Sequence, residues 1–274
     1  MTFTEQLRAG WLVGRFVCVG LDPDPAQLMA TTRSGDMAAR ITQFSRAVVD
    51  ATRDLVVAYK PNSAFYEQFG PAGMGALQDL IRYIHAAAPG VVVILDAKRG
   101  DIEHTNEAYA AALFDVYDAD AVTVQPYLGG DALAPFLNRL DRGVIVLCRT
   151  SNPGGGELQD LPVGQLPLYQ RIAELAETRW NRNGNCGLLV GATYPRELSL
   201  VRALAPSLPL LIAGVGRQQG AVREAAAAGM TSDGGIIVSS SSAVTHASGG
   251  PDFAEAARQA TLTLHQQLTG WLSR

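Results

Sequence analysis

The sequence has few cysteines, few aromatic residues and no excess of basic charge. Its 274 residues include 3 cysteines, and 22 Lys and Arg residues stand against 26 Asp and Glu residues, for a formal net charge of −4. Proteins that bind nucleic acid or anionic membranes carry clustered positive charge, and this chain has no block of like charges. We therefore expect neither nucleic acid nor a membrane as a partner.

The cysteines and the chain start indicate a cellular location. Cys18, Cys148 and Cys186 are odd in number, far apart, and each lies in or beside an apolar run. This pattern is typical of buried, reduced thiols rather than of a disulfide framework or a metal cluster. The start MTFTEQLRAG lacks the regions of a signal peptide, and no apolar run approaches the roughly 18 residues that span a bilayer. We expect a cytoplasmic protein.

Motifs for zinc and for nucleophilic catalysis are also missing. The four histidines are scattered and form no HExxH or related spacing, so a dedicated zinc site is not expected. No GxSxG nucleophile elbow is present. What remains is chemistry that lysines and carboxylates can perform.

Eight short apolar runs recur along the chain, and segments of helical periodicity lie between them. The runs are rich in β-branched residues and continuous where a half-exposed strand would alternate, which is typical of strands buried on both faces. They are FVCVG (16–20), LVVAY (55–59), VVVILD (91–96), AVTVQ (121–125), GVIVLC (143–148), CGLLVG (186–191), PLLIAG (209–214) and GGIIVS (234–239). This alternation predicts a (β/α)8 TIM barrel, with residues 1–274 as a single domain. An open doubly wound sheet is the structural alternative.

One long connection follows the fifth run. The segment SNPGGGELQDLPVGQ (151–165) contains four glycines. This composition predicts a glycine-rich mobile loop, which would serve as a lid or would be an ordinary flexible excursion.

Charged side chains follow the first three runs, at the end of each strand where a TIM barrel holds its active site. The charged residues are Asp22, Lys60, Asp96 and Lys98, and the uncharged polar residue Asn62 follows Lys60 closely. Strand alternation puts Asp96 and Lys98 on the same side, whereas Asp101 lies past the strand end. Solvated ion pairs on a rim would be worth under ~1 kcal/mol and need no function. Two lysines alternating with aspartates at neighbouring strand ends favour a catalytic array instead.

The last two strand ends are rich in glycine and serine. They read GVGRQQG (214–220) and SSSS (239–242). Glycines let backbone N–H groups approach an anion, and barrels often hold phosphate at this position. GVGRQQG differs in spacing and position from the dinucleotide fingerprint, and a simple tight turn is the alternative. The pattern predicts a phosphate site.

The text DAKRGDIEHT (96–105) resembles the D-x-K-x-x-D-I-x-x-T signature of the orotidine 5′-phosphate decarboxylase family. YKPNSAFYEQFG and TSNPG make the resemblance more specific and are similar to the longer-chain bacterial branch, the type 2 subfamily. It extends from GLDPDP at 20–25 to the serines of the eighth strand. The D-x-K-x-x-D core is shared with Mg²⁺-dependent sugar-phosphate decarboxylases and aldolases, which are the nearest alternative. A non-catalytic nucleotide-binding barrel is the other.

The resemblance implies a homodimer of TIM barrels that converts orotidine 5′-monophosphate to uridine 5′-monophosphate and CO₂, in de novo pyrimidine biosynthesis, without metal or organic cofactor. Lys98 would donate a proton to C6 of the pyrimidine, and Asp96 would lie against the departing carboxylate. Lys60 would link Asp96 to the ribose. Asp22 would bind ribose hydroxyls, and Asn62 would also belong to the substrate site.

Further roles follow from the same resemblance. Asp101 and Thr105 would reach into the site of the partner subunit, which would explain why Asp101 lies past its strand end. Ser151 would contact the pyrimidine edge. Gln218 would close over the phosphate, next to Gly216.

The phosphate end departs from the pattern of the family. Ser242 stands where the family usually has a phosphate-binding arginine, and Arg217 stands where the family commonly has a small residue. We therefore expect Arg217 to take over the phosphate charge.

Overall fold

The computed structural model describes residues 1–32, 35–215 and 219–270. Within these residues, eight parallel strands form a closed barrel in the order β1-β10-β9-β8-β5-β4-β3-β2. The strands are β1 Val17–Gly20, β2 Val56–Lys60, β3 Val92–Arg99, β4 Ala121–Val124, β5 Gly143–Arg149, β8 Cys186–Gly191, β9 Leu210–Ala213 and β10 Ile236–Ser240. Each predicted apolar run overlaps one of these strands. The predicted single-domain (β/α)8 barrel is therefore confirmed, and the doubly wound alternative is wrong.

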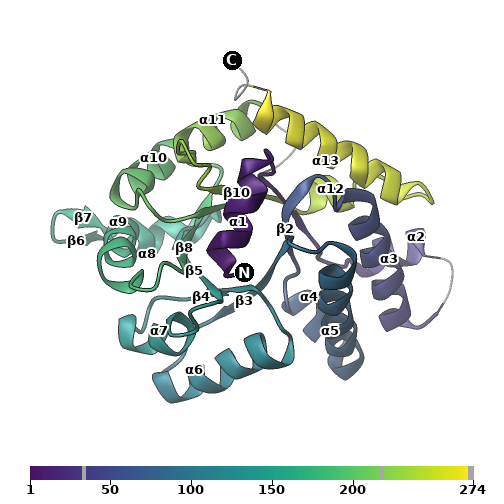
Figure 1. The fold of residues 1–274 in the computed structure, drawn as a ribbon, viewed down its shortest axis with the longest axis horizontal. Helices are drawn as coiled ribbons and strands as arrows, with labels where there is room; N and C mark the ends of the chain where they lie inside the picture. The colour runs from purple at the N-terminus through teal and green to yellow at the C-terminus, as the bar shows by residue number, and fades with distance from the viewer. Residues whose placement is uncertain (33–34, 216–218, 271–274) are drawn as a thin grey trace.

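Helices surround the strands as a ring (Figure 1). The α-helices are α1 Phe3–Leu12, α2 Pro25–Thr31, α3 Met37–Thr52, α4 Ala64–Glu67, α5 Gly70–Ala87, α6 Glu103–Ala110, α7 Gly130–Leu137, α8 Gly156–Gln159, α9 Leu168–Leu175, α10 Pro195–Leu204, α11 Gln219–Gly229, α12 Ser242–Thr245 and α13 Phe253–Thr269. A 3-10 turn spans Pro153–Gly155, and π-helical turns at Ala111–Val116 and Ala176–Trp180 extend α6 and α9. No helix in the described ranges combines the length and apolarity needed to cross a membrane.

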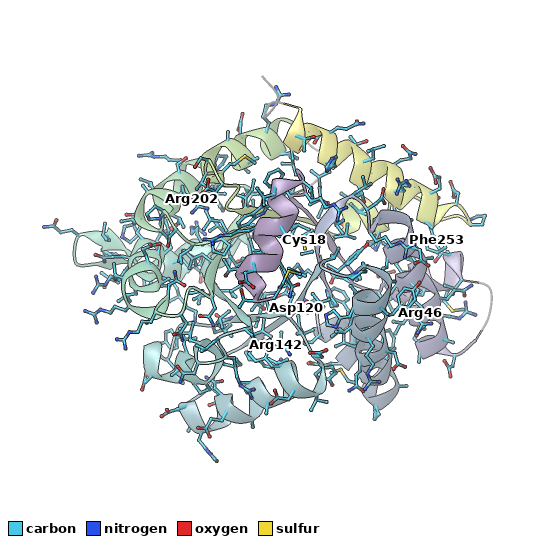
Figure 2. All side chains as sticks on the ribbon, in the orientation of Figure 1. Cys18, Arg46, Asp120, Arg142, Arg202 and Phe253 are labelled. Atoms are coloured by element: carbon cyan, nitrogen blue, oxygen red, sulfur yellow. The ribbon has the colours of Figure 1, made fainter. Side chains whose placement is uncertain are left out.

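Both faces of each strand are buried over most of its length, which explains why the runs are continuously apolar. Along β1, Val17 and Val19 pack in the layer between strands and helices. Cys18 faces the barrel interior, with Ile94 and Leu211 in the same inner cluster, and lies near the centre of the barrel in Figure 2. Strand alternation thus fills two cores at once.

Helix α1 closes one end of the barrel. Phe3 and Leu7 belong to the inner cluster, and the Phe3 ring lies against Gly143 at the start of β5. The Trp11 indole N–H donates to the carbonyl of Ile236, the first residue of β10, at 2.8 Å. In Figure 1 this helix crosses the centre of the ring. Because it covers the amino ends of the strands, the carboxyl ends remain for a binding site.

The predicted loop 151–165 contains short regular elements. The 3-10 turn is followed by α8, and β6 Pro162–Val163 pairs antiparallel with β7 Leu166–Pro167. The segment is therefore more regular than its glycine content indicated, and its mobility stays a prediction.

Candidate active site

A cavity of about 600 Å³ lies at the carboxyl ends of the barrel strands. Its volume is within the usual range for sites that bind small molecules. Its polar and charged lining residues are Lys60, Asp96, Lys98, Gln125, Thr150, Ser151, Asn152, Gln159, Ser239, Ser241 and Ser242. The structure therefore brings Lys60, Asp96, Lys98 and Ser151 together, as the strand-end pattern predicts.

The carboxylate of Asp96 is the centre of the polar network. The Lys60 ammonium donates to Oδ2 at 3.0 Å, and the Lys98 ammonium donates to Oδ1 at 2.6 Å. The Thr123 hydroxyl donates to Oδ1 at 2.8 Å, and the Asn62 amide donates to Oδ2 at 3.4 Å. Side chains from β2, β3, β4 and the turn after β2 thus converge on one carboxylate.

Burial and charge act in opposite directions on this network. Burial raises the pKa of Asp96, but the charges of Lys60 and Lys98, with hydrogen bonds from Lys98 and Thr123, outweigh it and lower the pKa to about 2. Burial lowers the pKa of Lys60, yet the nearby carboxylates of Asp96 and Asp22 raise it overall. The Lys98 side chain is 40% exposed, against 8% for Lys60. Lys98 is therefore the more accessible of the two ammonium groups that line the cavity.

An irregularity in β3 positions Lys98. Leu95 pairs with Val122, but the next paired residue is Arg99, which lies opposite Val124. Three residues of β3 therefore oppose Thr123 alone. Lys98 has φ of +46° within this bulge, and its N–H donates to the Thr123 hydroxyl at 2.9 Å. Asp96 and Lys98 do meet, as expected, but the regular alternation used to predict it does not hold here.

Asp22 joins the first and last strand ends. Its Oδ1 accepts the backbone N–H of Asn62 at 3.1 Å. Its Oδ2 accepts the Ser241 hydroxyl at 2.6 Å. The predicted residues Asp22 and Asn62 therefore belong to one hydrogen-bonded group next to Lys60 and Asp96.

Ser151 follows β5 and lies where two other strands end. A Cβ at Gly191 would come within 2.8 Å of the Ser151 backbone nitrogen. Gly214 has φ of +81°, and a Cβ there would come within 3.2 Å of Ser151 Oγ. Glycine is required at both positions for Ser151 to reach the cavity wall.

Asp101 and Thr105 are not among the described residues that line the cavity. The Asp101 carboxylate accepts the backbone N–H of Ile102 at 2.7 Å. The backbone N–H of Asp101 donates to the side-chain oxygen of Asn106 at 3.1 Å. These contacts fix the turn between β3 and α6. The predicted reach of both residues into a partner subunit stays a prediction.

The predicted phosphate residues Gly216, Arg217 and Gln218 lie outside the described residues. Ser242 begins α12 and lines the cavity. Among residues 1–32, 35–215 and 219–270, no group of three or more His, Cys, Asp and Glu side chains is arranged to hold a metal ion.

Comparison with known proteins gives the family. A match to the orotidine 5′-phosphate decarboxylase / HUMPS family covers residues 15–260. The chain belongs to this family. Proteins named orotidine 5′-phosphate decarboxylase from Cupriavidus necator and Ralstonia pickettii are each 50% identical to it over 271 residues, 98% of both chains. The structure of Leishmania donovani OMP decarboxylase is 38% identical with a TM-score of 0.82, over 97% of this chain and 99% of that chain.

In this member of the orotidine 5′-phosphate decarboxylase family, several side chains around the cavity have no role predicted from the sequence. Thr123 is the one polar residue of the apolar strand β4, and that isolated hydroxyl was an available signal. Gln125 is the residue directly after strand β4, and its side chain lines the cavity. Arg149 ends β5, is 4% exposed and binds Asp160. No local pattern indicates the Arg149 contact, because it depends on how the loop folds back.

Proposed function

We propose that this protein is a carboxy-lyase that converts orotidine 5′-monophosphate to uridine 5′-monophosphate and CO₂ in de novo pyrimidine biosynthesis, with Lys98 as the proton donor. The observation that carries the proposal is the array of Lys60, Asp96 and Lys98 in the cavity of a barrel of this family. Relatives that are 50% identical over nearly the whole chain carry the name of this enzyme.

The ammonium of Lys98 supplies the differential stabilisation that this reaction requires. When the C–C bond to the carboxylate breaks, CO₂ leaves as a neutral molecule and the electron pair stays on C6 of the pyrimidine. The Lys98 ammonium is attracted more strongly as this negative charge grows, so it stabilises the transition state more than the substrate. It then donates its proton to C6.

Asp96 adds a smaller contribution. Its low pKa keeps it ionised, so it repels the substrate carboxylate until that group leaves. At ~4 Å and an effective dielectric constant of about 20, this repulsion is roughly 4 kcal/mol, whereas large enzymatic accelerations require ~20 kcal/mol. Electrostatic fit to the developing carbanion, and binding energy used to close the 151–165 loop, supply the larger part.

The remaining cavity residues bind the substrate in this proposal. Asp22 binds ribose hydroxyls, and Ser151 contacts the pyrimidine edge. Gln218 and Arg217 hold the phosphate, with Arg217 supplying the positive charge that Ser242 lacks. The variant Arg217→Ala is expected to bind uridine 5′-monophosphate more weakly in a calorimetric titration. Unchanged affinity would contradict the assignment of Arg217.

The proposal includes a homodimer with shared active sites. Ile102 and Tyr127 are 60% and 86% exposed and follow β3 and β4, which are paired strands. Large apolar side chains exposed at neighbouring strand ends favour burial against a second copy of the chain. Asp101 precedes Ile102 in the turn before α6, and Thr105 lies in the first turn of α6. A contact at Ile102 would therefore carry both residues toward the partner's cavity.

Mixing two inactive variants tests the shared site. Lys98→Ala and Asp101→Ala homodimers are each expected to be inactive. A hybrid dimer has one site with both residues intact if they come from different chains, so mixing is expected to restore part of the activity. No recovery, despite subunit exchange confirmed by mass spectrometry, would contradict the shared site.

The proposal also places the protein in the cytoplasm. Cys18, Cys148 and Cys186 are buried, free thiols, and burial raises the pKa of each. Reduced, buried cysteines are typical of a reducing compartment.

The reaction itself is tested by adding the purified protein to orotidine 5′-monophosphate in excess EDTA and following the ultraviolet change as orotate becomes uracil. Turnover that continues in EDTA is the expected result, because the proposed chemistry uses no metal. No turnover, together with activity on a phosphorylated keto-sugar in the presence of Mg²⁺, would contradict the proposal and favour the sugar-phosphate alternative.

A further inference from the structure

We propose that Thr123 is a positioning residue that fixes the geometry of Asp96 relative to Lys98 through its hydroxyl group. The inference rests on the proposed function, because it concerns the same two side chains. Thr123 does not line the cavity among the described residues, so it acts through its two neighbours rather than by touching the substrate.

The Thr123 hydroxyl is bound on both sides. It donates to Asp96 Oδ1 at 2.8 Å and accepts the Lys98 backbone N–H at 2.9 Å. The same Oδ1 also accepts the Lys98 ammonium at 2.6 Å. One hydroxyl therefore holds Lys98 at its backbone directly and at its charged end through Asp96.

The position of Thr123 in β4 buries its hydroxyl away from solvent. Ala121 belongs to the inner cluster, whereas Val122 and Val124 belong to the layer under the helices. Strand alternation therefore directs Thr123 into the barrel, where it is 0% exposed. A hydroxyl in this position is unfavourable unless it is hydrogen-bonded, and both of its bonds go to the catalytic segment.

The backbone of Lys98 explains why such a tether is needed. Its φ of +46° lies in the left-handed region, which is unfavourable for a residue with a Cβ atom. The ladder between β3 and β4 is interrupted from Leu95 to Arg99, so the Thr123 hydroxyl takes the Lys98 N–H inside this gap. Without the hydroxyl, we expect the bulge to relax and the ammonium to move away from C6.

The test compares Thr123→Val, Thr123→Ser and a matched control. Valine has the shape of threonine without the hydroxyl, and serine restores the hydroxyl. Because small displacements of reacting groups are costly, we expect Thr123→Val to lower kcat for orotidine 5′-monophosphate about 100-fold, with KM and the affinity for uridine 5′-monophosphate unchanged. Thr123→Ser is expected to regain most of the lost rate.

The control is Thr261→Val in α13. Thr261 is also 0% exposed, and its hydroxyl donates to the Ala257 carbonyl at 2.7 Å, so the chemical change is the same at a site away from the cavity. Wild-type kcat is expected for this variant. If Thr123→Val does not fold, Thr123→Ala removes the same hydroxyl and is measured in its place.

Two results would overturn the inference while leaving the reaction in place: wild-type kcat in Thr123→Val, or a Thr123→Ser enzyme as slow as Thr123→Val. A wild-type protein without activity on orotidine 5′-monophosphate would instead contradict the proposed function. The positioning of Asp96 then still has its own readout by carboxyl NMR titration, in which Thr123→Val is expected to raise the pKa of Asp96 and Thr123→Ser to leave it low. An equal pKa in wild type and Thr123→Val would contradict the tether.

Discussion

The ionised state of Asp96 links the chemistry of the site to the stability of the fold. The side chain is 5% exposed, and two ammonium groups, a hydroxyl and an amide donate to it. A buried carboxylate is unfavourable unless it is paired in this way. The pairs lower its pKa from an ordinary value of 3.8 to about 2, so the folded protein holds this proton less tightly than the unfolded chain does.

The low pKa predicts a pH dependence that Asp96→Asn removes. A lowered pKa contributes stability that is present above the unfolded value of 3.8 and is lost as pH falls toward about 2. The free energy of unfolding of the wild type, relative to that of Asp96→Asn, is therefore expected to fall progressively from about pH 5 to about pH 1, with roughly half of the loss reached by pH 3. The full loss is on the order of 2 kcal/mol. Urea unfolding of both proteins at each pH measures it, and a difference that stays constant would contradict the low pKa.

Strand β5 and the loop after it are joined by a buried arginine. The Arg149 guanidinium lies 3.1 Å from Asp160, donates to Gln159 at 3.2 Å, and stacks over the Tyr194 ring at 4.5 Å. Gln159 in turn accepts the N–H of Thr150 at 2.9 Å. These contacts connect both ends of the segment that carries Ser151 to the cavity.

We expect Arg149→Met to loosen this segment. Methionine keeps an apolar stem but loses the charged hydrogen bonds, each worth about 1.5–3 kcal/mol, so KM for orotidine 5′-monophosphate should rise roughly tenfold. Hydrogen exchange of residues 151–165 should become faster. Arg139→Met is the control, because it breaks a two-bond ion pair with Asp115 on the surface. Equal KM values and equal hydrogen-exchange rates in the wild type and Arg149→Met would show that Arg149 does not hold this segment in place.

At the scale of the whole molecule, the residues that stabilise the fold and the residues of the candidate active site lie at opposite ends of the barrel. Helix α1 fills the amino end with Phe3 and Leu7, which are 1% and 0% exposed, and the catalytic array occupies the carboxyl end. Substitutions in α1 should therefore change folding without changing the site.

The variant Phe3→Ala tests this separation. Removing a buried ring is expected to lower the free energy of unfolding by about 3–5 kcal/mol, while kcat per folded molecule stays at the wild-type value. Leu12→Ala on the same helix is the control, because Leu12 is 88% exposed and should change stability by less than about 0.5 kcal/mol. A large loss of kcat in folded Phe3→Ala would show that the two ends are coupled.

The sequence predicts the features of this molecule that depend on local pattern. Continuous apolar runs identify the barrel strands, and polar strand ends place Lys60, Asp96 and Lys98 in one cavity. The bulge at Lys98 was missed because no glycine marks its positive φ. The Arg149 contacts were missed because they join residues whose meeting depends on how a loop folds.

Three further elements were missed: two short strands and the first helix. Strands β6 and β7 have two residues each and contain prolines, which favour a loop assignment. Helix α1 does carry a local signal, since Thr2 and Glu5 form a capping box. It precedes the first strand and adds no βα unit, so the alternation of strands and helices did not require it.

The role of Lys98 is tested most directly by the rate of orotidine 5′-monophosphate decarboxylation by Lys98→Ala, measured beside the wild type in excess EDTA. If Lys98 stabilises the charge on C6 and donates the proton, kcat should fall at least about 1,000-fold, while the variant still binds uridine 5′-monophosphate. A Lys98→Ala enzyme that binds this nucleotide and turns over within tenfold of the wild-type rate would contradict the role of Lys98 as proton donor.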